Sequence, residues 1–151
     1  MSDFVKADDV FVNEHAMSRE EVLRFLSQQA EAKGISNNAD ATYEAFMARE
    51  GMGETGMTDG FAVPHAKDES ILNAGVLVFK NDTPLDWPSF DEKPIDVAIA
   101  LFVPAGEAGT THIQLLSKTA VLLMKDDFKA LVHGTDDKQK IADAINAGIA
   151  E

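Results

Sequence analysis

The chain has 151 residues, in which 26 acidic side chains outnumber 13 basic ones, and it contains no cysteine. The lack of cysteine excludes disulfides, thiolate nucleophiles and cysteine-based zinc sites. A formal net charge of −13 argues against binding to nucleic acid or anionic membranes, since both attract basic surfaces. The length and the 45% hydrophobic share predict one domain over residues 1–151. The acidic N-terminus and the lack of an apolar run of about 20 residues predict a cytoplasmic protein.

In chain order, the pattern predicts two helices, three strands and three more helices, with an optional short strand at Val10–Val12. The helices are expected over residues 19–33, 39–50, 112–124, 128–133 and 138–149, and the strands over residues 61–63, 71–80 and 95–103. Side chains that accept hydrogen bonds from the first turn mark the helix starts. They are Ser18 with Glu21, Asn37 or Asn38, Thr110 or Thr111, Asp126 or Asp127, and Asp136 or Asp137.

The two longer strands are almost continuously apolar, which is typical of strands that are covered on both faces. They are separated by a turn-rich loop that contains three prolines and the single tryptophan. The order of elements therefore predicts an α/β domain in which a sheet lies between layers of helices.

His65 is the residue that the sequence presents most clearly for chemistry. It follows Pro64 in the run GMTDGFAVPHAK, residues 56–67. Because proline lacks an N–H and holds Val63 extended, we expect the imidazole at a strand end or in a tight loop, within reach of a partner. Four interpretations stay open: a surface histidine, a metal ligand, a general base, or an acceptor of a phosphoryl group to which Lys67 donates.

His112 is the second candidate, at the start of the predicted helix THIQLLSKTAVLLM. The helix dipole at that position disfavours the imidazolium form, and the free N–H groups of a first turn bind anions. Both effects favour a phosphoryl group transferring nearby. The alternative is that His112 occupies an exposed first turn without a chemical role.

Arg49 lies at the end of the second predicted helix, where its forked, permanent charge suits a phosphate. The alternative for Arg49 is an interaction with the negative end of the helix dipole. Asp59 is close enough in sequence to orient the imidazole of His65, or it is a turn residue. The surroundings of His15 and His133 do not distinguish them from surface or capping residues.

The pattern Gly51-x-Gly53-x-x-Gly56 formally matches a dinucleotide-binding motif. Here it follows a helix and precedes a strand, whereas the motif follows a strand and opens a helix. We therefore expect these glycines to permit a tight backbone path, and we expect neither a cofactor nor a metal.

Together, these segments resemble the fructose/mannitol-type enzyme IIA domains of the bacterial sugar phosphotransferase system. In that family a helix ending in Arg-Glu, here residues 49–50, precedes a glycine-rich strand ending in Pro-His, here residues 64–65. A second histidine then heads a helix, here HIQLLSKTA, residues 112–120. The resemblance covers about residues 4–149.

The resemblance implies a three-layer α/β/α domain with a small mixed sheet. By position, His65 is the phosphorylated nucleophile, and His112 and Arg49 line the site and stabilise charge. The implied partners are the phosphocarrier protein HPr as donor, an enzyme IIB as acceptor and, indirectly, a membrane enzyme IIC. Ala66 departs from the family, which commonly has glycine there, and its methyl group is expected to narrow the approach to the imidazole.

The segment PLDWPSFDEKPIDVAIALFVPA, residues 84–105, favours the fructose-like branch of the family and hence a role in sugar uptake. An alternative is a regulatory, nitrogen-type enzyme IIA, which binds a partner according to its phosphorylation state. A third hypothesis is a non-catalytic sugar or anion binder, in which His65 is not phosphorylated.

Overall fold

The computed structural model describes residues 5–106 and 110–150, without the side chains of residues 110–113 and 150. Its sheet has five strands: β1 (Val10–Glu14), β2 (Phe61–Ala62), β3 (His65–Asp68), β4 (Gly75–Leu85) and β5 (Ile95–Pro104). The strand order is β1-β4-β5-β2, and β3 also pairs with β5. Since β4 and β5 are antiparallel and the other pairs are parallel, the expected mixed sheet is confirmed.

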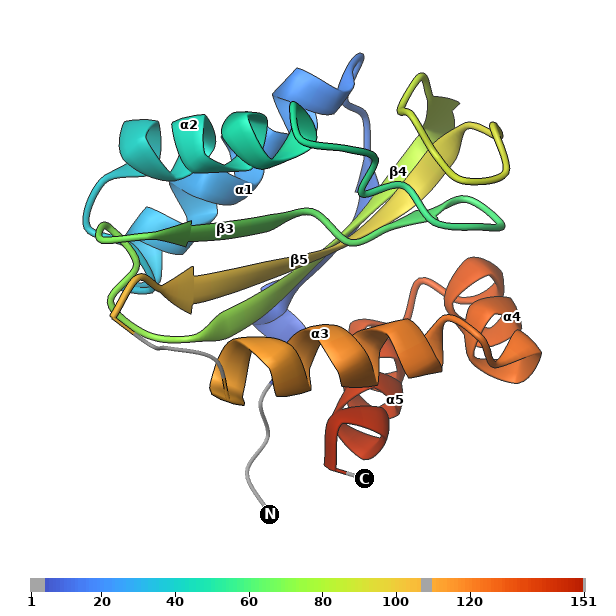
Figure 1. Ribbon diagram of the computed structural model, residues 1–151. Helices are drawn as coiled ribbons and strands as arrows, with labels where there is room; N and C mark the ends of the chain where they lie inside the picture. Colours follow the sequence, from blue (N-terminus) through green and yellow to red (C-terminus); the bar gives the residue numbers. More distant parts are fainter. Residues whose placement is uncertain (1–4, 107–109, 151) are drawn as a thin grey trace.

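Helices cover both faces of this sheet (Figure 1). One layer contains α1 (Arg19–Ala32) and α2 (Ala39–Glu50). The other contains α3 (Thr110–Leu122), α4 (Asp126–Gly134) and α5 (Lys138–Ala150), and a short 3-10 helix, Ala7–Asp9, precedes β1. The predicted three-layer α/β/α architecture is therefore confirmed.

The continuous apolar run of β5 divides between two cores, as the pleat of a strand requires. Its side chains at positions 97, 99 and 101 pack in the cluster that contains Leu115, Leu122 and Ile141 from the helices on one side. Those at positions 98, 100 and 102 pack with Leu23 and Phe46 on the other side. All six β5 side chains are at most 2% exposed, so burial on both faces places β5 between the two helical layers.

β2 and β3 follow β5 in one continuous register. Phe61 aligns with Val97 and His65 aligns with Leu101, so the offset is 36 residues in both strands (97 − 61 and 101 − 65). Pro64 lies between the two strands, and its carbonyl still accepts a hydrogen bond from the backbone N–H of Leu101 at 2.9 Å. The proline therefore interrupts the strand without shifting it.

The sequence prediction did not include β3, and it is also wrong for the start of one strand and the cap of one helix. The strand expected over residues 71–80 begins at Gly75 and continues to Leu85, because Leu72 pairs instead with the α1–α2 connection through a 2.7 Å bond to the carbonyl of Ile35. The predicted aspartate cap of α4 is also wrong. Lys125 occupies that position without a side-chain cap, and Asp127 accepts only from the neighbouring backbone N–H of Phe128.

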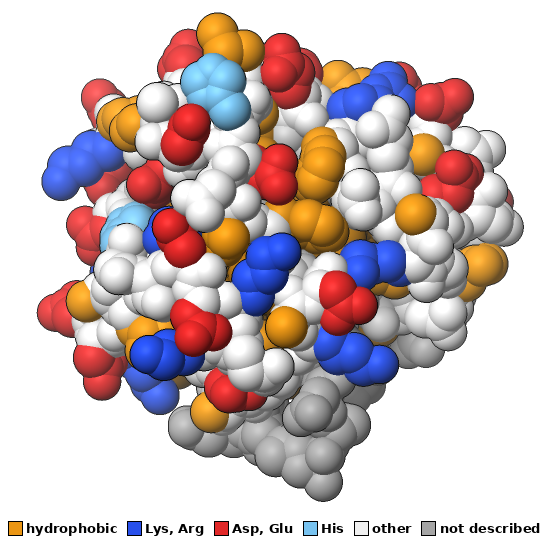
Figure 2. Space-filling model, turned by 180° about the vertical axis from the view of Figure 1, so that it is seen from behind, with side chains coloured by type: hydrophobic (Ala, Val, Ile, Leu, Met, Phe, Trp, Pro, Cys, Tyr) orange, Lys and Arg blue, Asp and Glu red, His pale blue; other side chains and the backbone are white. Residues whose placement is uncertain are grey.

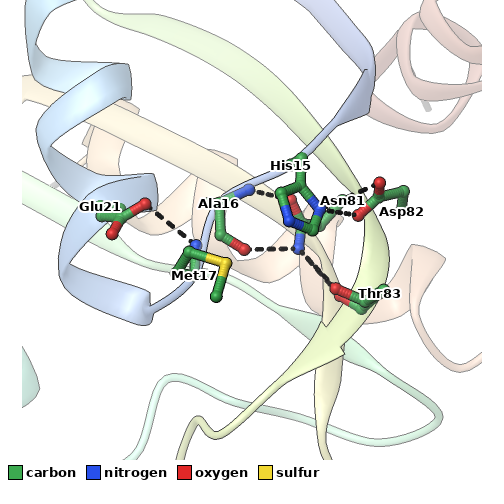
Figure 3. Close-up of polar contacts among 7 residues, drawn as sticks. All are labelled: His15, Ala16, Met17, Glu21, Asn81, Asp82 and Thr83. Atoms are coloured by element: carbon green, nitrogen blue, oxygen red, sulfur yellow. Dashed lines mark hydrogen bonds and ion pairs between the residues drawn. The ribbon is translucent and has the colours of Figure 1, made fainter.

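Asn81 ties the end of β4 to the segment that connects β1 with α1 (Figure 3). Its amide oxygen accepts from the backbone N–H of Ala16 at 2.7 Å, and its amide nitrogen donates to the carbonyl groups of Ala16 and Thr83 at 3.1 and 2.9 Å. Asn81 is 5% exposed, so these bonds replace water for three backbone groups. The neighbouring pair of His15 and Asp82 lies at the surface.

Charges of both signs are mixed on the face seen from behind the view of Figure 1. There, lysine and arginine side chains lie among aspartate and glutamate side chains and are not gathered into one stripe (Figure 2). Among the helices that the structure describes, none has the length and the apolar content needed to cross a membrane.

Replacing Asn81 by alanine leaves the backbone N–H and carbonyl of Ala16 without their side-chain partners in a buried place. We expect Asn81→Ala to lower the free energy of unfolding by about 1–3 kcal/mol, measured by urea denaturation. Asp82→Ala is the matched control, since it removes only an exposed pair and should change stability much less. Equal losses in the two variants would contradict the role given to Asn81.

Candidate functional site

His65 lies on the outermost strand of the sheet, where it is partly exposed. It is the first residue of β3, and not the end of the preceding strand, because pairing resumes directly after Pro64. Its Nδ1 lies 3.1 Å from the carbonyl oxygen of Val63, and its Nε2 lies 2.9 Å from Nε of Arg49. Both ring nitrogens are therefore held by protein groups.

These two contacts assign the tautomer of His65. The guanidinium of Arg49 can only donate, so Nε2 accepts and carries the lone pair. The ring proton is then on Nδ1, which donates to the carbonyl of Val63; the assignment follows from the hydrogen-bond partners. The arrangement is a neutral imidazole whose nucleophilic nitrogen, Nε2, faces Arg49.

Arg49 joins three parts of the site from the last turn of α2. Its Nε donates to His65, and its Nη1 donates to the carbonyl of Gly53 at 3.0 Å. The structure thus brings together Arg49 and His65, which the sequence analysis singled out separately. Charge stabilisation of a phosphoryl group by Arg49 stays a prediction.

Gly56 allows the glycine-rich loop to pack against the β4–β5 connection. A Cβ atom at this position would lie 2.2 Å from the carbonyl oxygen of Pro88 and 2.8 Å from Cβ of Ser89. Backbone atoms cannot yield to such a contact as the end of a side chain can. Glycine at position 56 therefore provides the tight backbone path between α2 and His65.

Glu50 is a buried carboxylate beside Arg49, with its side chain 2% exposed. The hydroxyl of Thr55 donates to one carboxylate oxygen and the indole N–H of Trp87 donates to the other at 3.2 Å. Nη1 of Arg19 lies 3.7 Å from the carboxylate. Burial raises the pKa of Glu50, although the hydrogen bonds from Thr55 and Trp87 and the charge of Arg19 act in the opposite direction.

Asp59 takes the second of the two roles considered for it, that of a turn residue. In the described contacts its carboxylate pairs with Lys129, with Oδ2 2.6 Å from Nζ, and it does not contact His65. The hydrogen bond from Lys129 lowers the pKa of Asp59. Asp59 adopts a left-handed backbone conformation (φ 57°), as turn residues do, so the turn alternative is the correct one.

The remaining histidines with described side chains lie in separate ion pairs. His15 contacts Asp82, and Nε2 of His133 lies 3.2 Å from the carboxylate of Asp96. Within the part of the chain that the structure describes, no three potential ligand side chains gather into a metal site.

His112 lies in the first turn of α3, which begins at Thr110. Its side chain is outside the described residues, so its role beside His65 stays a prediction. Lys67 lies two residues after His65 on β3, and the pleat of a strand directs both side chains to the same side. A donor role for Lys67 is likewise still a prediction.

The methyl group of Ala66 does not narrow the approach to the imidazole, contrary to expectation. Ala66 is fully buried in the cluster on the α1–α2 side of the sheet. Adjacent residues of a strand point to opposite faces, so the methyl group is directed away from the side of His65. Alanine in place of the family's usual glycine at position 66 is therefore accommodated in the core.

The fold and the site define a three-layer α/β/α domain that presents a neutral histidine beside an arginine at the edge of the sheet. Residues 3–148 match the family described as Phosphoenolpyruvate-dependent sugar phosphotransferase system, EIIA 2. The chain belongs to this family.

Three relatives differ in the role that their names give. The chain is 31% identical over 140 residues to the PTS system 2-O-alpha-mannosyl-D-glycerate-specific EIIABC component of Escherichia coli K12, covering 92% of the chain and 21% of that protein. It is 28% identical over 136 residues to the PTS system fructose-specific EIIA component of Haloferax volcanii, with coverages of 90% and 88%. It is 36% identical over 107 residues to the Nitrogen regulatory protein of Escherichia coli K12, with coverages of 70% and 64%. The chain thus spans only about a fifth of the first relative.

Solved structures with the same fold include a nitrogen regulatory protein and a sugar-specific enzyme IIA. Nitrogen Regulatory Protein IIA-Ntr from Neisseria meningitidis superposes with a TM-score of 0.87 at 20% identity, covering 94% of this chain and 96% of that one. Enzyme IIA mannitol from Escherichia coli, in complex with phosphorylated enzyme IIB mannitol, gives 0.75 at 20% identity, with coverages of 97% and 96%. These likenesses support the fold.

The sequence analysis gave no role to Glu50, Thr55 or Trp87, which the structure brings together beside the site. A glutamate at a helix end is usually exposed, and its burial here depends on residues that are distant in the chain. The one available signal was the single tryptophan, because a buried indole usually finds a partner for its N–H.

The close approach at Gly56 predicts an asymmetry between two glycines of the loop. Gly56→Ala should lower the free energy of unfolding by about 1–3 kcal/mol, because the added methyl group forces the loop away from Pro88. Gly51→Ala is the matched control. Its φ of −69° suits alanine and a Cβ atom there makes ordinary contacts, so it should keep or slightly raise stability. Thermal unfolding of both variants tests this, and a neutral Gly56→Ala would contradict the packing argument.

Proposed function

We propose that the protein is a phosphotransfer component of the sugar phosphotransferase system, which accepts a phosphoryl group from phosphorylated HPr on Nε2 of His65 and passes it to an enzyme IIB. Membership of the EIIA 2 family supports the reaction class. The observation that carries the choice of atom is the pair of hydrogen bonds at the ring, because they leave the lone pair on Nε2 and the proton on Nδ1.

In the proposed reaction, Nε2 of His65 attacks the phosphorus of the donor's phosphohistidine. An Nε2–P bond forms as the donor's N–P bond breaks, and the electron pair of that bond stays on the donor imidazole. The guanidinium of Arg49, now on the lone pair at 2.9 Å, transfers its hydrogen bond to a phosphoryl oxygen. A permanent positive charge placed there stabilises the charge of the transferring group.

The carbonyl of Val63 suits the second half of the transfer. While Nδ1 keeps its proton, the phosphorylated ring is cationic, and the carbonyl stabilises that form by accepting the Nδ1–H bond. In the transfer to enzyme IIB, a nucleophile of that protein forms a bond to phosphorus as the Nε2–P bond breaks. The electron pair of the Nε2–P bond returns to Nε2, and His65 is left as a neutral imidazole. A site that holds the Nδ1 proton therefore favours both loading and release.

We further assign His112 a supporting role in charge stabilisation, from the first turn of α3. The free N–H groups of a helix start favour anions, which fits a site for a phosphoryl group. His112 is not the acceptor in this scheme, so its replacement should slow transfer without abolishing acceptance.

An enzyme IIB partner is supported by the mannitol complex, in which a domain of the same fold is bound to a phosphorylated IIB. Met52 offers an apolar contact beside the site, since it is 81% exposed and lies in the turn whose Gly53 carbonyl binds Arg49. Exposed methionine is enriched at protein interfaces. The net charge of −13 favours basic partner surfaces.

The second candidate is a regulatory role through phosphorylation-dependent protein binding. It is favoured by the 36% identity to the Nitrogen regulatory protein of Escherichia coli and by the fold likeness to IIA-Ntr. Sugar uptake, of a fructose-like sugar, is favoured by the fructose-specific EIIA relative, which matches over most of both chains. Both roles use the same phosphorylated histidine and differ in the acceptor.

Incubation with phosphoenolpyruvate, enzyme I and HPr should place one acid-labile phosphoryl group on the protein. Phosphorus–proton NMR couplings should assign it to Nε2 of His65, and His65→Ala should take up none. His133→Ala is the matched control, since that histidine lies in a separate ion pair, and it should be loaded normally. Failure of the parent protein to accept the group, or its attachment at Nδ1, contradicts the proposal. Transfer onward to an enzyme IIB then separates transport from regulation.

Arg49→Met should slow the loading of His65 by about 100-fold, because it removes the charge-assisted donor that faces the transferring group. Arg49→Lys should recover only part of the rate, because one ammonium does not reproduce a forked donor to both His65 and Gly53. Arg24→Met, which removes an exposed arginine of α1 paired with Asp40, is the control and should load at the parent rate. Rapid-quench measurements of phosphoprotein give the loading rate of each variant. Equal loading rates in all three variants would exclude a role for Arg49.

A further inference from the structure

Glu50 is a buried charged group that the phosphotransfer scheme does not use. It directly follows Arg49 in the chain, and its side chain is 2% exposed. Three separate segments converge on its carboxylate: Thr55 from the glycine-rich loop, Trp87 from the β4–β5 connection, and Arg19 from the start of α1. A carboxylate with this many partners fixes the relative positions of the segments that carry them.

The contacts continue from Thr55 to the imidazole. The hydroxyl of Thr55 donates to Glu50, and the carbonyl of the same residue accepts the backbone N–H of Val63 at 2.9 Å. The carbonyl of Val63 in turn accepts the Nδ1 proton of His65 at 3.1 Å. The group that holds the ring proton is therefore linked to Glu50 by one residue on the outer side of the strand.

The carboxylate of Glu50 also affects the other ring nitrogen, Nε2 of His65, through Arg49, the preceding residue in the chain. Arg49 and Glu50 leave the end of α2 in different directions: Arg49 reaches Gly53 and Nε2 of His65, while Glu50 reaches Thr55. The side chains of residues 49 and 50 thereby hold the loop at positions 53 and 55, respectively. Anchoring Glu50 fixes the helix end from which the guanidinium extends.

We propose that Glu50 is a positioning residue for His65. Glu50 holds Arg49 at Nε2 and the Val63 carbonyl at Nδ1, so that one tautomer of His65 presents its lone pair for phosphoryl transfer. The reaction-rate part of this inference rests on the proposed function, whereas the tautomer part does not.

Stability alone does not account for a carboxylate at this position. A buried carboxylate is costly to desolvate even when it is partnered, and burial raises the pKa of Glu50 because it makes the ionised form less favourable than in the unfolded chain. A neutral group of the same shape should therefore be accepted without loss of the fold. Such a conflict between local stability and residue choice is expected at functional sites.

Two substitutions of Glu50 test whether its hydrogen bonds position His65: one keeps them and the other removes them. In Glu50→Gln, the amide oxygen can accept from Trp87 and the amide nitrogen can donate to the hydroxyl of Thr55, because a hydroxyl both donates and accepts. Glu50→Leu has a similar volume and removes every one of these bonds. We expect Glu50→Leu to slow the loading of His65 by about 100-fold, as small misplacements of reacting groups do, and Glu50→Gln to restore most of the rate.

The decisive measurement is the protonation of the two ring nitrogens of His65, read from nitrogen-15 NMR spectra of the unphosphorylated protein. The parent and Glu50→Gln should show the proton on Nδ1 alone, whereas Glu50→Leu should show a mixture of tautomers. A residue that only stabilises the fold would leave this spectrum unchanged at a temperature at which the variant is folded.

Lys80→Met is the matched control for a purely structural anchor. The side chain of Lys80 is also largely buried, at 12% exposed. Its ammonium holds the end of α4 by donating to the carbonyl groups of His133 and Thr135 at 3.2 and 2.7 Å. This variant should unfold more easily than the parent while keeping the His65 tautomer and the loading rate.

A folded Glu50→Leu variant that keeps the Nδ1–H tautomer and the parent rate overturns the proposal. If Glu50→Leu does not fold, Thr55→Val decides instead. It removes one hydroxyl at similar volume and should change the tautomer and the rate in the same direction, and a spectrum identical to that of the parent refutes the positioning role. If the parent protein is not phosphorylated at all, the proposed function fails, and the NMR comparison still decides the role of Glu50.

Discussion

The hydrogen bond from Nε of Arg49 to Nε2 of His65 is the interaction on which the rest of the site depends. A guanidinium cannot accept, so this one bond determines which ring nitrogen is nucleophilic and which carries the proton. It also joins the end of α2 to the start of β3, 16 residues later in the chain. The loop between them must then have a fixed shape, which explains the close approach of Gly56 to the β4–β5 connection.

Much of the scaffold was predictable because its signals are local. Apolar periodicity placed every α-helix to within two residues of the observed bounds, although it missed the short 3-10 helix Ala7–Asp9. Ser18, Asn38 and Asp137 accept first-turn N–H bonds as their residue types suggest. The continuous apolar run of β5 correctly predicted burial on both faces, because only a central strand needs side chains of that kind at every position. His65 and Arg49 were found by similar local patterns, a histidine after a proline and an arginine at the end of a predicted helix.

The parts that were missed depend on contacts between distant segments. Asp59 is six positions from His65, yet it pairs with Lys129, 70 residues away. The partners of Glu50 come from α1 and from the β4–β5 connection, so its burial has no signature in the residues around it. The extension of β4 to Leu85 likewise depends on a partner outside the strand, because Leu85 pairs with Ile95 of β5.

The position of His65 on an edge strand of the sheet has a consequence for self-association. An open sheet edge offers free N–H and carbonyl groups on which another chain can add a strand, leading to aggregation. Here residues 55–57 pair with the outer side of β2, through bonds of 2.9 and 2.7 Å that join Thr55 to Val63 and Met57 to Phe61. This segment therefore covers the edge of the sheet directly before His65, where an added strand would otherwise pair.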